Sequence, residues 1–239
     1  MANTVFCSLA DEANMMNSHF RTALLLWAIA GMPTVIPSTS SQNDAPAPLS
    51  KMVQVRESQD SSSSALFTNT LTSAHLPGGV VAVLDCVSPD EPKLSMPALT
   101  TSLKDALNSI TALDRRYRWE MQRGAINLLP VAGEPELLKA KIQDFEIDES
   151  KASVLFASGI LLQNSDVQRA EARLRLKRDG LETYIGGISP GTEIKLNLQD
   201  VTVREALNAI ANAHGHAIWR YSESHCDGQN IFAITWIVR

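Results

Sequence analysis

The sequence lacks the short motifs that mark the common catalytic and nucleotide-binding sites. It contains no G-x-S-x-G nucleophile elbow, no P-loop, no G-x-G-x-x-G dinucleotide fingerprint and no H-E-x-x-H zinc motif. The acidic pair Asp148-Glu149 lies where a helix cap is expected, so it does not indicate a general acid and base. These absences predict a protein that is not an enzyme and that uses no cofactor. An unrecognised hydrolase is the alternative.

Residues that could ligate a metal are few, and they are not spaced for coordination. His214, His216, His225 and Cys226 are of the types that bind zinc. About seven extended residues separate the first pair from the second, which is roughly 20 Å along a strand. We therefore expect surface or turn histidines and no metal site.

Positive charge is in deficit. The chain carries 21 Lys and Arg against 26 Asp and Glu, a net charge of −5 at pH 7. A nucleic-acid-binding domain normally carries a basic excess, so no nucleic-acid partner is expected. The basic run from Arg169 to Arg178 is expected to be a solvated helix face on which Glu171 reduces the repulsion between the basic side chains. Binding to an anionic partner is the alternative.

Long hydrophobic runs are missing as well. The apolar run near the N-terminus, residues 22–30, is too short and too close to Pro33 to predict a membrane-spanning helix. It follows Arg21 and ends in Ala-Ile-Ala, which is the basic, apolar and small-residue pattern of a secretory signal peptide. Acidic residues precede the pattern, so translation is expected to begin at Met15 or Met16. The pattern predicts a periplasmic or secreted protein. An uncleaved signal anchor in the membrane and a buried helix are the alternatives.

Cysteine is scarce, with three residues in the chain. Cys7 precedes the expected cleavage site, which leaves Cys86 and Cys226 in the exported protein. An even pair can form a disulfide in an oxidising compartment, and two separate thiols are the alternative.

What the sequence does contain is an internal repeat. VTVREALNAIANAHGHAIWRY covers residues 201–221, and TSLKDALNSITALDRRYRWEM covers residues 101–121. Five residues of the first copy recur 100 positions later in the second. They are Ala106, Leu107, Asn108, Ile110 and Trp119, which return as Ala206, Leu207, Asn208, Ile210 and Trp219.

Each copy predicts a short amphipathic helix. Ser102 and Thr202 precede the helices, and an acidic residue follows three positions later, which is the spacing of a capping box. Apolar residues then recur at i, i+3, i+4 and i+7 and form one stripe. The helices are expected to end near Asp114 and near Gly215.

A β-hairpin is expected after each helix, and a strand before it. Residues 117–122 alternate between apolar and polar side chains and lead into the turn at 123–124, while a longer turn over 222–230 is expected in the second copy. Residues 93–96 and 193–198 are the predicted preceding strands. Each copy is then a β-α-β-β module, with its helix lying across its own small antiparallel or mixed sheet. The predicted fold class is α+β.

This order of strand, leucine-rich helix and apolar hairpin resembles the short N-terminal domain of secretins and TonB-dependent receptors, the STN-like domain. The resemblance covers residues 193–238 and, more weakly, residues 93–130. No β-barrel, plug or secretin pore region follows, so a pore or receptor role is not carried over. The resemblance implies a periplasmic module, here in tandem, that docks on other proteins of the bacterial envelope.

The strand aromatics have two interpretations. Trp119 and Trp219, with Tyr117 and Tyr221, are expected to pack over the helix stripes as core residues. The alternative is a surface between the modules that stacks on a sugar or a peptide. The predicted function is therefore protein–protein contact through exposed strand edges, with an envelope protein as the partner. A periplasmic protein that binds a small ligand or carbohydrate is the alternative.

The chain is expected to divide into five parts. They are an N-terminal extension with signal peptide (1–36), a disordered Ser- and Pro-rich linker (37–64), the first module (65–131), a central strand and helices (132–190) and the second module (191–239). In the central part we expect a helix capped by Asp148 or Ser150 and a helix over residues 165–177 that ends at Gly180.

Overall fold

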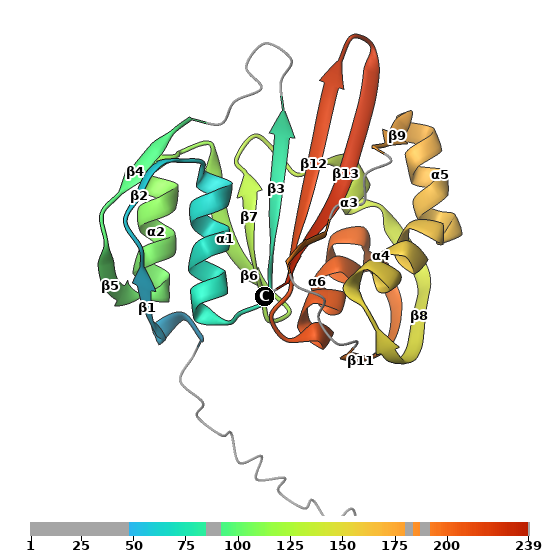
Figure 1. The fold of residues 1–239 in the computed structure, drawn as a ribbon. Coiled ribbons are helices and arrows are strands. Elements are labelled where there is room, and N and C mark those ends of the chain that lie inside the picture. The colour runs from blue at the N-terminus through green and yellow to red at the C-terminus, as the bar shows by residue number, and fades with distance from the viewer. Residues whose placement is uncertain (1–47, 85–91, 180–183, 187–191, 239) are drawn as a thin grey trace, which may run out of the picture. The chain divides into compact units, whose positions relative to one another are not determined.

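The computed structural model describes residues 48–84, 92–179, 184–186 and 192–238, and it has an α+β fold (Figure 1). We call the elements before residue 131 the first half. They are η1 (Pro48–Ser50), β1 (Met52–Val55), β2 (Ser58–Ser61), α1 (Ser63–Ala74), β3 (Gly78–Leu84), β4 (Leu94–Met96), β5 (Leu99–Ser102), α2 (Leu103–Leu113), β6 (Tyr117–Gln122) and β7 (Ala125–Pro130).

The later elements form the second half. They are α3 (Glu136–Lys139), β8 (Lys141–Ala152), α4 (Val154–Gln163), α5 (Ser165–Leu174), β9 (Leu176–Arg178), β10 (Tyr184–Gly186), β11 (Thr192–Thr202), α6 (Val203–His214), β12 (Ile218–Cys226) and β13 (Gln229–Val238).

The two repeated helices, α2 and α6, begin and end where the sequence predicts. The hydroxyl oxygens of Ser102 and Thr202 each accept a hydrogen bond from the backbone N–H three residues later. Glu205 also reaches back to the N–H of Thr202, which completes the capping box of α6. The shorter side chain of Asp105 instead accepts from the Ser102 hydroxyl at 2.7 Å. The helix α6 ends at Gly215, whose φ of +95° suits glycine.

Both hairpins turn through two residues with positive φ, Arg123-Gly124 and Asp227-Gly228. Such turns match the twist of paired strands. The longer turn predicted over residues 222–230 is therefore wrong, because β12 and β13 stay paired out to Cys226 and Gln229. His225 lies in a strand and not in a loop.

The two hairpins belong to one central sheet and not to two small sheets. The strand order is β10-β13-β12-β3-β7-β6, and β9 also pairs with β13. The strand β3 joins the hairpins, because it pairs in parallel with β12 on one side and with β7 on the other. The two predicted modules therefore do not have separate hairpin sheets, and the described residues all belong to one compact unit, Asp44–Arg239.

The halves repeat one strand pattern in opposite directions. In the first half, β3 pairs in parallel with β7, which pairs antiparallel with β6. In the second half, β9 and β10 pair in parallel with β13, which pairs antiparallel with β12. Because β12 runs parallel to β3, the second set of strands runs opposite to the first. A half-turn about an axis in the sheet, perpendicular to the strands, combined with a shift of three strands along that axis, approximately relates the halves and exchanges the two faces.

This relation places the helices of the two halves on opposite faces of the sheet (Figure 1). The helices α1 and α2 pack on the face that carries Val80 and Leu128. The helices α4, α5 and α6 pack on the face that carries Val81 and Leu129. All four of these strand side chains are fully buried. Each half therefore buries part of the sheet that belongs to the other.

The strand before each repeated helix pairs outside the central sheet. The strand β5 pairs antiparallel with β1, and β11 pairs antiparallel with β8. The first helical N–H groups are bound in the same way in both halves, since Leu103 N donates to Lys51 O at 2.8 Å and Val203 N donates to Ala140 O at 3.0 Å. The repeat is thus larger than predicted, and residues 93–96 are not the counterpart of β11.

The predicted linker is wrong over residues 48–64, and residues 1–47 lie outside the described residues. The strand β1 buries Val53 and Val55, and Ser62 caps α1. The Ser-rich stretch folds because its side chains find acceptors, as Ser63 does by donating to Asp114 at 2.5 Å.

The predicted bounds of two central helices are also wrong. The strand β8 continues to Ala152, so α4 is capped by Ser153 and not by Asp148 or Ser150. The helix α5 ends before Arg175, which adopts a left-handed conformation (φ +54°). Within the described residues, no helix combines the length and the hydropathy that a membrane crossing needs.

Candidate functional site

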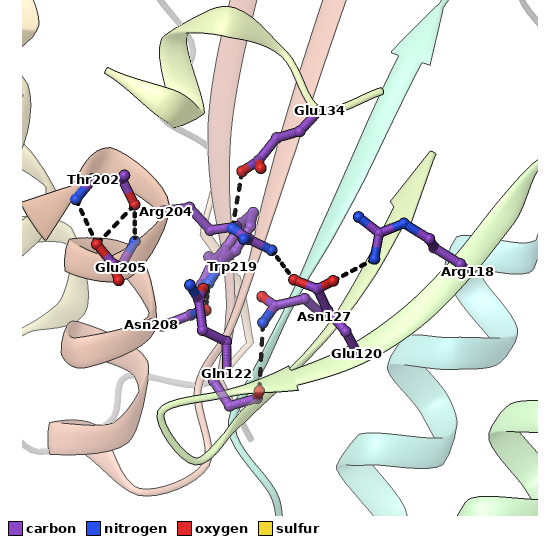
Figure 2. A network of polar contacts seen from close by, with 11 residues as sticks. Arg118, Glu120, Gln122, Asn127, Glu134, Thr202, Arg204, Glu205, Asn208 and Trp219 are labelled. Carbon is purple, nitrogen blue, oxygen red and sulfur yellow. Dashed lines mark hydrogen bonds and ion pairs between the residues drawn. The ribbon is translucent and has the colours of Figure 1, made fainter. Parts of the chain in front are cut away.

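The helix α6 lies against the first-half strand β6, and Arg204 is at the centre of that contact. Arg204 pairs with Glu120 of β6, and its Nε lies 2.9 Å from Oε1 of Glu134, which follows β7. The side chains of Arg204 and Glu134 are only 12% and 13% exposed. Arg118 also pairs with Glu120, from a side chain that is 50% exposed. Figure 2 shows Arg204 between the two carboxylates.

Burial and pairing shift these two carboxyl groups in opposite directions. Burial raises the pKa of Glu134 above its usual value, although the charge of Arg204 acts against the rise. Burial would also raise the pKa of Glu120, but hydrogen bonds from Arg118 and Arg204 outweigh it and lower that pKa. Arg204 is therefore the cation that both carboxylates share.

One helical turn further along α6, Asn208 connects the halves a second time. Its Oδ1 accepts a hydrogen bond from Trp219 Nε1 at 2.9 Å, and its Nδ2 donates to Gln122 Oε1 at 3.3 Å. Asn208 and Trp219 are fully buried. The amide thus joins the indole of its own half to the strand β6 of the other half (Figure 2).

A third turn of α6 binds the end of the hairpin. Asn212 Nδ2 donates to the carbonyl oxygen of Arg123 at 2.7 Å, and the Arg123 guanidinium lies 3.3 Å from Glu205. Residues at i, i+4 and i+8 of one helix, namely Arg204, Asn208 and Asn212, therefore hold the C-terminal end of β6 and the turn that follows it.

The first half repeats the tryptophan–asparagine bond in a more open position. Trp119 Nε1 donates to Asn108 Oδ1 at 3.0 Å. Trp219 is fully buried, whereas Trp119 is partly buried and Asn108 is exposed. The difference follows from position, because β12 lies inside the central sheet and β6 lies at its end.

A shallow hollow of about 460 Å³ lies beside Trp119. It is lined by α2 and β6 and by the residues between them, including Thr111, Arg115 and Tyr117. This hollow and the outer edge of β6 form what we call the β6 site.

The outer edge of β6 has no strand beside it within the described residues. The residues that flank a two-residue turn exchange hydrogen bonds, and the pattern then alternates along an antiparallel pair. Counted from Arg123-Gly124, the backbone N–H and C=O groups of Tyr117, Trp119 and Met121 point away from β7, and the N–H of Tyr117 already donates to the carbonyl oxygen of Asp114 at 3.2 Å. In the other half the residue equivalent to Tyr117 is Ala217, whose carbonyl oxygen accepts from the N–H of Gly78 in β3 at 3.2 Å.

The structure separates the four aromatics that the sequence singles out. Trp219 and Tyr221 are fully buried and Tyr117 is 7% exposed, so the core interpretation is confirmed for these three. Trp119 packs with the helices of the first half and Trp219 with those of the second, on opposite faces of the sheet. The alternative of one stacking surface shared by all four is therefore wrong. Trp119 alone keeps an open side.

A row of polar side chains follows the second half's hairpin strand. The Tyr221 hydroxyl donates to Glu223, and Glu223 Oε1 lies 2.8 Å from Nε2 of His225. Burial, together with the hydrogen bond to Glu223, raises the pKa of Tyr221 far above its usual value. Tyr221 also stacks on Phe232, with ring centroids 5.9 Å apart. The tyrosine stays protonated and supports the hairpin.

Cys226, at the end of β12, is disulfide-bonded. Its predicted partner, Cys86, lies outside the described residues, so the Cys86–Cys226 pairing stays a prediction. The last described pair of β3 and β12 is Leu84 with Ser224, and each cysteine follows two positions later in the sequence.

The paired tryptophan–asparagine bonds allow a matched test of burial. We expect Asn208→Ala to lower the free energy of unfolding by about 2 kcal/mol, because the buried Trp219 N–H loses its acceptor. We expect Asn108→Ala to cost less than about 1 kcal/mol, because water can replace Asn108 beside the partly exposed Trp119. Urea unfolding of both variants measures the difference. Equal losses would contradict the stated exposure of the two bonds.

No protein-family model, curated protein or solved structure matches this chain. The resemblance to the STN-like domain therefore stays a prediction.

The Arg204 cluster was not predicted from the sequence. The signal was present, because Arg204, Asn208 and Asn212 form a polar row on α6, next to its apolar stripe. What the sequence did not show is that this row meets a strand of the other repeat.

Proposed function

We propose that this chain is a non-enzymatic, exported cell-envelope protein that acts as a protein–protein interaction module, and that the β6 site is its docking surface. The observation that carries the proposal is the contrast between one face of β6, whose side chains contact α6, and the outer edge of β6, whose backbone groups lie beside no described strand. Three turns of α6 hold the C-terminal end of β6 and its turn, while the outer edge of β6 has no strand beside it within the described residues.

An edge strand of this kind suits strand addition. A six-residue strand in unbroken register offers backbone donors and acceptors, and a partner strand can extend the sheet by bonding to them. Fixing the strand in advance lowers the entropy cost of binding. The resemblance to a periplasmic docking domain, described above, agrees with this use.

The docking surface can be tested at Met121. Its side chain is 47% exposed and its N–H points outward, so Met121→Pro removes one edge donor without disturbing the pairing to β7. We expect this variant to recover at least about ten-fold less of a partner from an envelope extract, the change that accompanies a loss of about 1.4 kcal/mol.

Met121→Ala is the matched control, because it removes the same side chain but keeps the N–H group. We expect this variant to recover partners as the native chain does. Equal recovery of the same proteins by the proline and alanine variants would count against docking at this edge.

Export is the second part of the proposal, and it is supported by the signal-like pattern of residues 22–30. We expect N-terminal sequencing of the exported protein to find a start after Ala30. A mature chain that begins at Met1 or Ala2 would contradict cleavage.

One observation favours a different candidate function, the binding of a small ligand or carbohydrate. The open side of Trp119 faces the hollow that Tyr117 and Arg115 also line, and an exposed indole can stack on a sugar ring. In that case a soluble saccharide would change the fluorescence of Trp119, and Met121→Pro would leave this change intact.

A further inference from the structure

The strand β12 is the second-half equivalent of β6, and its outer edge is occupied at the junction between the two halves. The strand β12 pairs in parallel with β3, and Trp219 lies opposite Gly79. A Cβ atom at Gly79 would stand 2.1 Å from Cε2 and Cζ2 of Trp219, far inside van der Waals contact. The indole therefore leans over the neighbouring strand, and it can do so only because that strand has a glycine at this position.

The β6 site has a tryptophan, an asparagine and outward-pointing backbone groups like those of β12, but no strand lies beside it within the described residues. Trp119 stands on β6 where Trp219 stands on β12, and each indole donates to the asparagine of its own helix. The partly buried Trp119 borders the hollow of about 460 Å³. The backbone groups of β6 that correspond to those bound by β3 point outward.

We infer that β6 accepts an extended segment of another protein, running parallel to β6 and carrying a glycine opposite Trp119. This inference rests on the proposed function, and it specifies the chemistry of the partner. The glycine lets the indole of Trp119 close over the incoming backbone as Trp219 closes over β3. The hollow is the space that the indole and the new strand would share.

Charge and strand length further restrict which segments could pair with β6. Arg115 lines the hollow, is exposed, and has no ion-pair partner among the described residues, whereas the equivalent position in the second half is Gly215. A carboxylate N-terminal to the glycine would face this arginine in the parallel register. A second copy of this chain is a poorer fit, because the described parts of β9 and β10, at the far end of its sheet, have three residues each against six in β6.

The test uses two synthetic peptides and the full chain. The first peptide has the sequence Glu-Leu-Pro-Gly-Gly-Val-Val-Ala-Val-Lys-Lys, which follows β3 with solubilising ends. The second has alanine in place of the second glycine. Binding is followed by tryptophan fluorescence, because Trp219 and Trp236 are fully buried and Trp119 is not. A Trp119→Phe variant checks that the signal comes from Trp119.

We expect the glycine peptide to shift the emission to the blue and to bind on the order of ten-fold more tightly than the alanine peptide. Met121→Pro should abolish binding of the glycine peptide, and Met121→Ala should retain it. Equal binding of the two peptides would overturn the glycine requirement. Self-association of the chain that Met121→Pro removes would make a second copy the occupant and would also overturn the inference.

The outcomes separate this inference from the proposed function. If neither peptide binds but Met121→Pro still loses partners from the envelope extract, the edge docks something other than a glycine-bearing parallel strand. In that case the inference fails and the function stands. If Met121→Pro changes neither the peptide signal nor the recovery of partners, both fail.

Discussion

Gly79→Ala is expected to lower the free energy of unfolding by about 3 kcal/mol or more, at the upper end of the range for overpacking a core. The added Cβ would meet the Trp219 ring at 2.1 Å and Asn127 Oδ1 at 2.6 Å. Neither neighbour has room to move, because both residues are fully buried at the junction of β12, β3 and β7. Chemical unfolding, followed by circular dichroism, measures the loss.

Gly159→Ala is the matched control for this variant. Gly159 lies inside α4, and a Cβ atom there would have no neighbour within 4 Å. Alanine is favoured over glycine inside a helix, so we expect a gain of about 0.5–1 kcal/mol. A Gly79→Ala protein as stable as the native chain would show that Trp219 does not lean over β3 as described.

Arg204→Ala is expected to cost about 3–5 kcal/mol at neutral pH, because it leaves Glu134 and Glu120 without the buried cation between them. The control is Arg118→Ala, which removes a half-exposed partner of the same Glu120 and should cost less than about 1 kcal/mol. Urea unfolding at pH 7 compares the two variants. Similar small losses would contradict a shared, buried role for Arg204.

The cost of Arg204→Ala should also depend on pH. In the native chain the pKa of Glu134 is raised, so this carboxyl contributes stability below its ordinary pKa and loses it as the pH rises through its folded pKa. Removing Arg204 removes the charge that opposes the rise, so Glu134 would take up a proton at a higher pH than in the native chain. The loss of unfolding free energy in the Arg204→Ala variant, relative to the native chain, should therefore be largest at neutral pH and become smaller as the pH falls. A deficit that grows on acidification would contradict this account.

Local features of the fold could be predicted from the sequence, because they depend on neighbouring residues. The N-caps at Ser102 and Thr202, the glycine that ends α6 and the turn at Arg123-Gly124 each follow from one or two side chains and their preferred backbone angles. The apolar stripes gave the buried faces of α2 and α6 for the same reason.

The assembly of the sheet could not be predicted in this way. An alternating pattern tells which side chains share a face, but not which strand lies beside which. The strand β3 has no pattern that says it joins two hairpins, and β1 was hidden by the polar residues around Val53 and Val55. The Arg204 cluster and the β6 site depend on this non-local pairing, so neither could be located from the repeat alone.

The position of β12 has a consequence for the order in which the chain can fold. This strand follows every element of the first half in the sequence, yet it lies in the middle of the central sheet, between β3 and β13. Until it arrives, an emerging N-terminal portion would leave Val81 and Leu129 facing water, since the helices that cover them come later in the chain. The central sheet should therefore be completed only after β12 and β13 have left the ribosome.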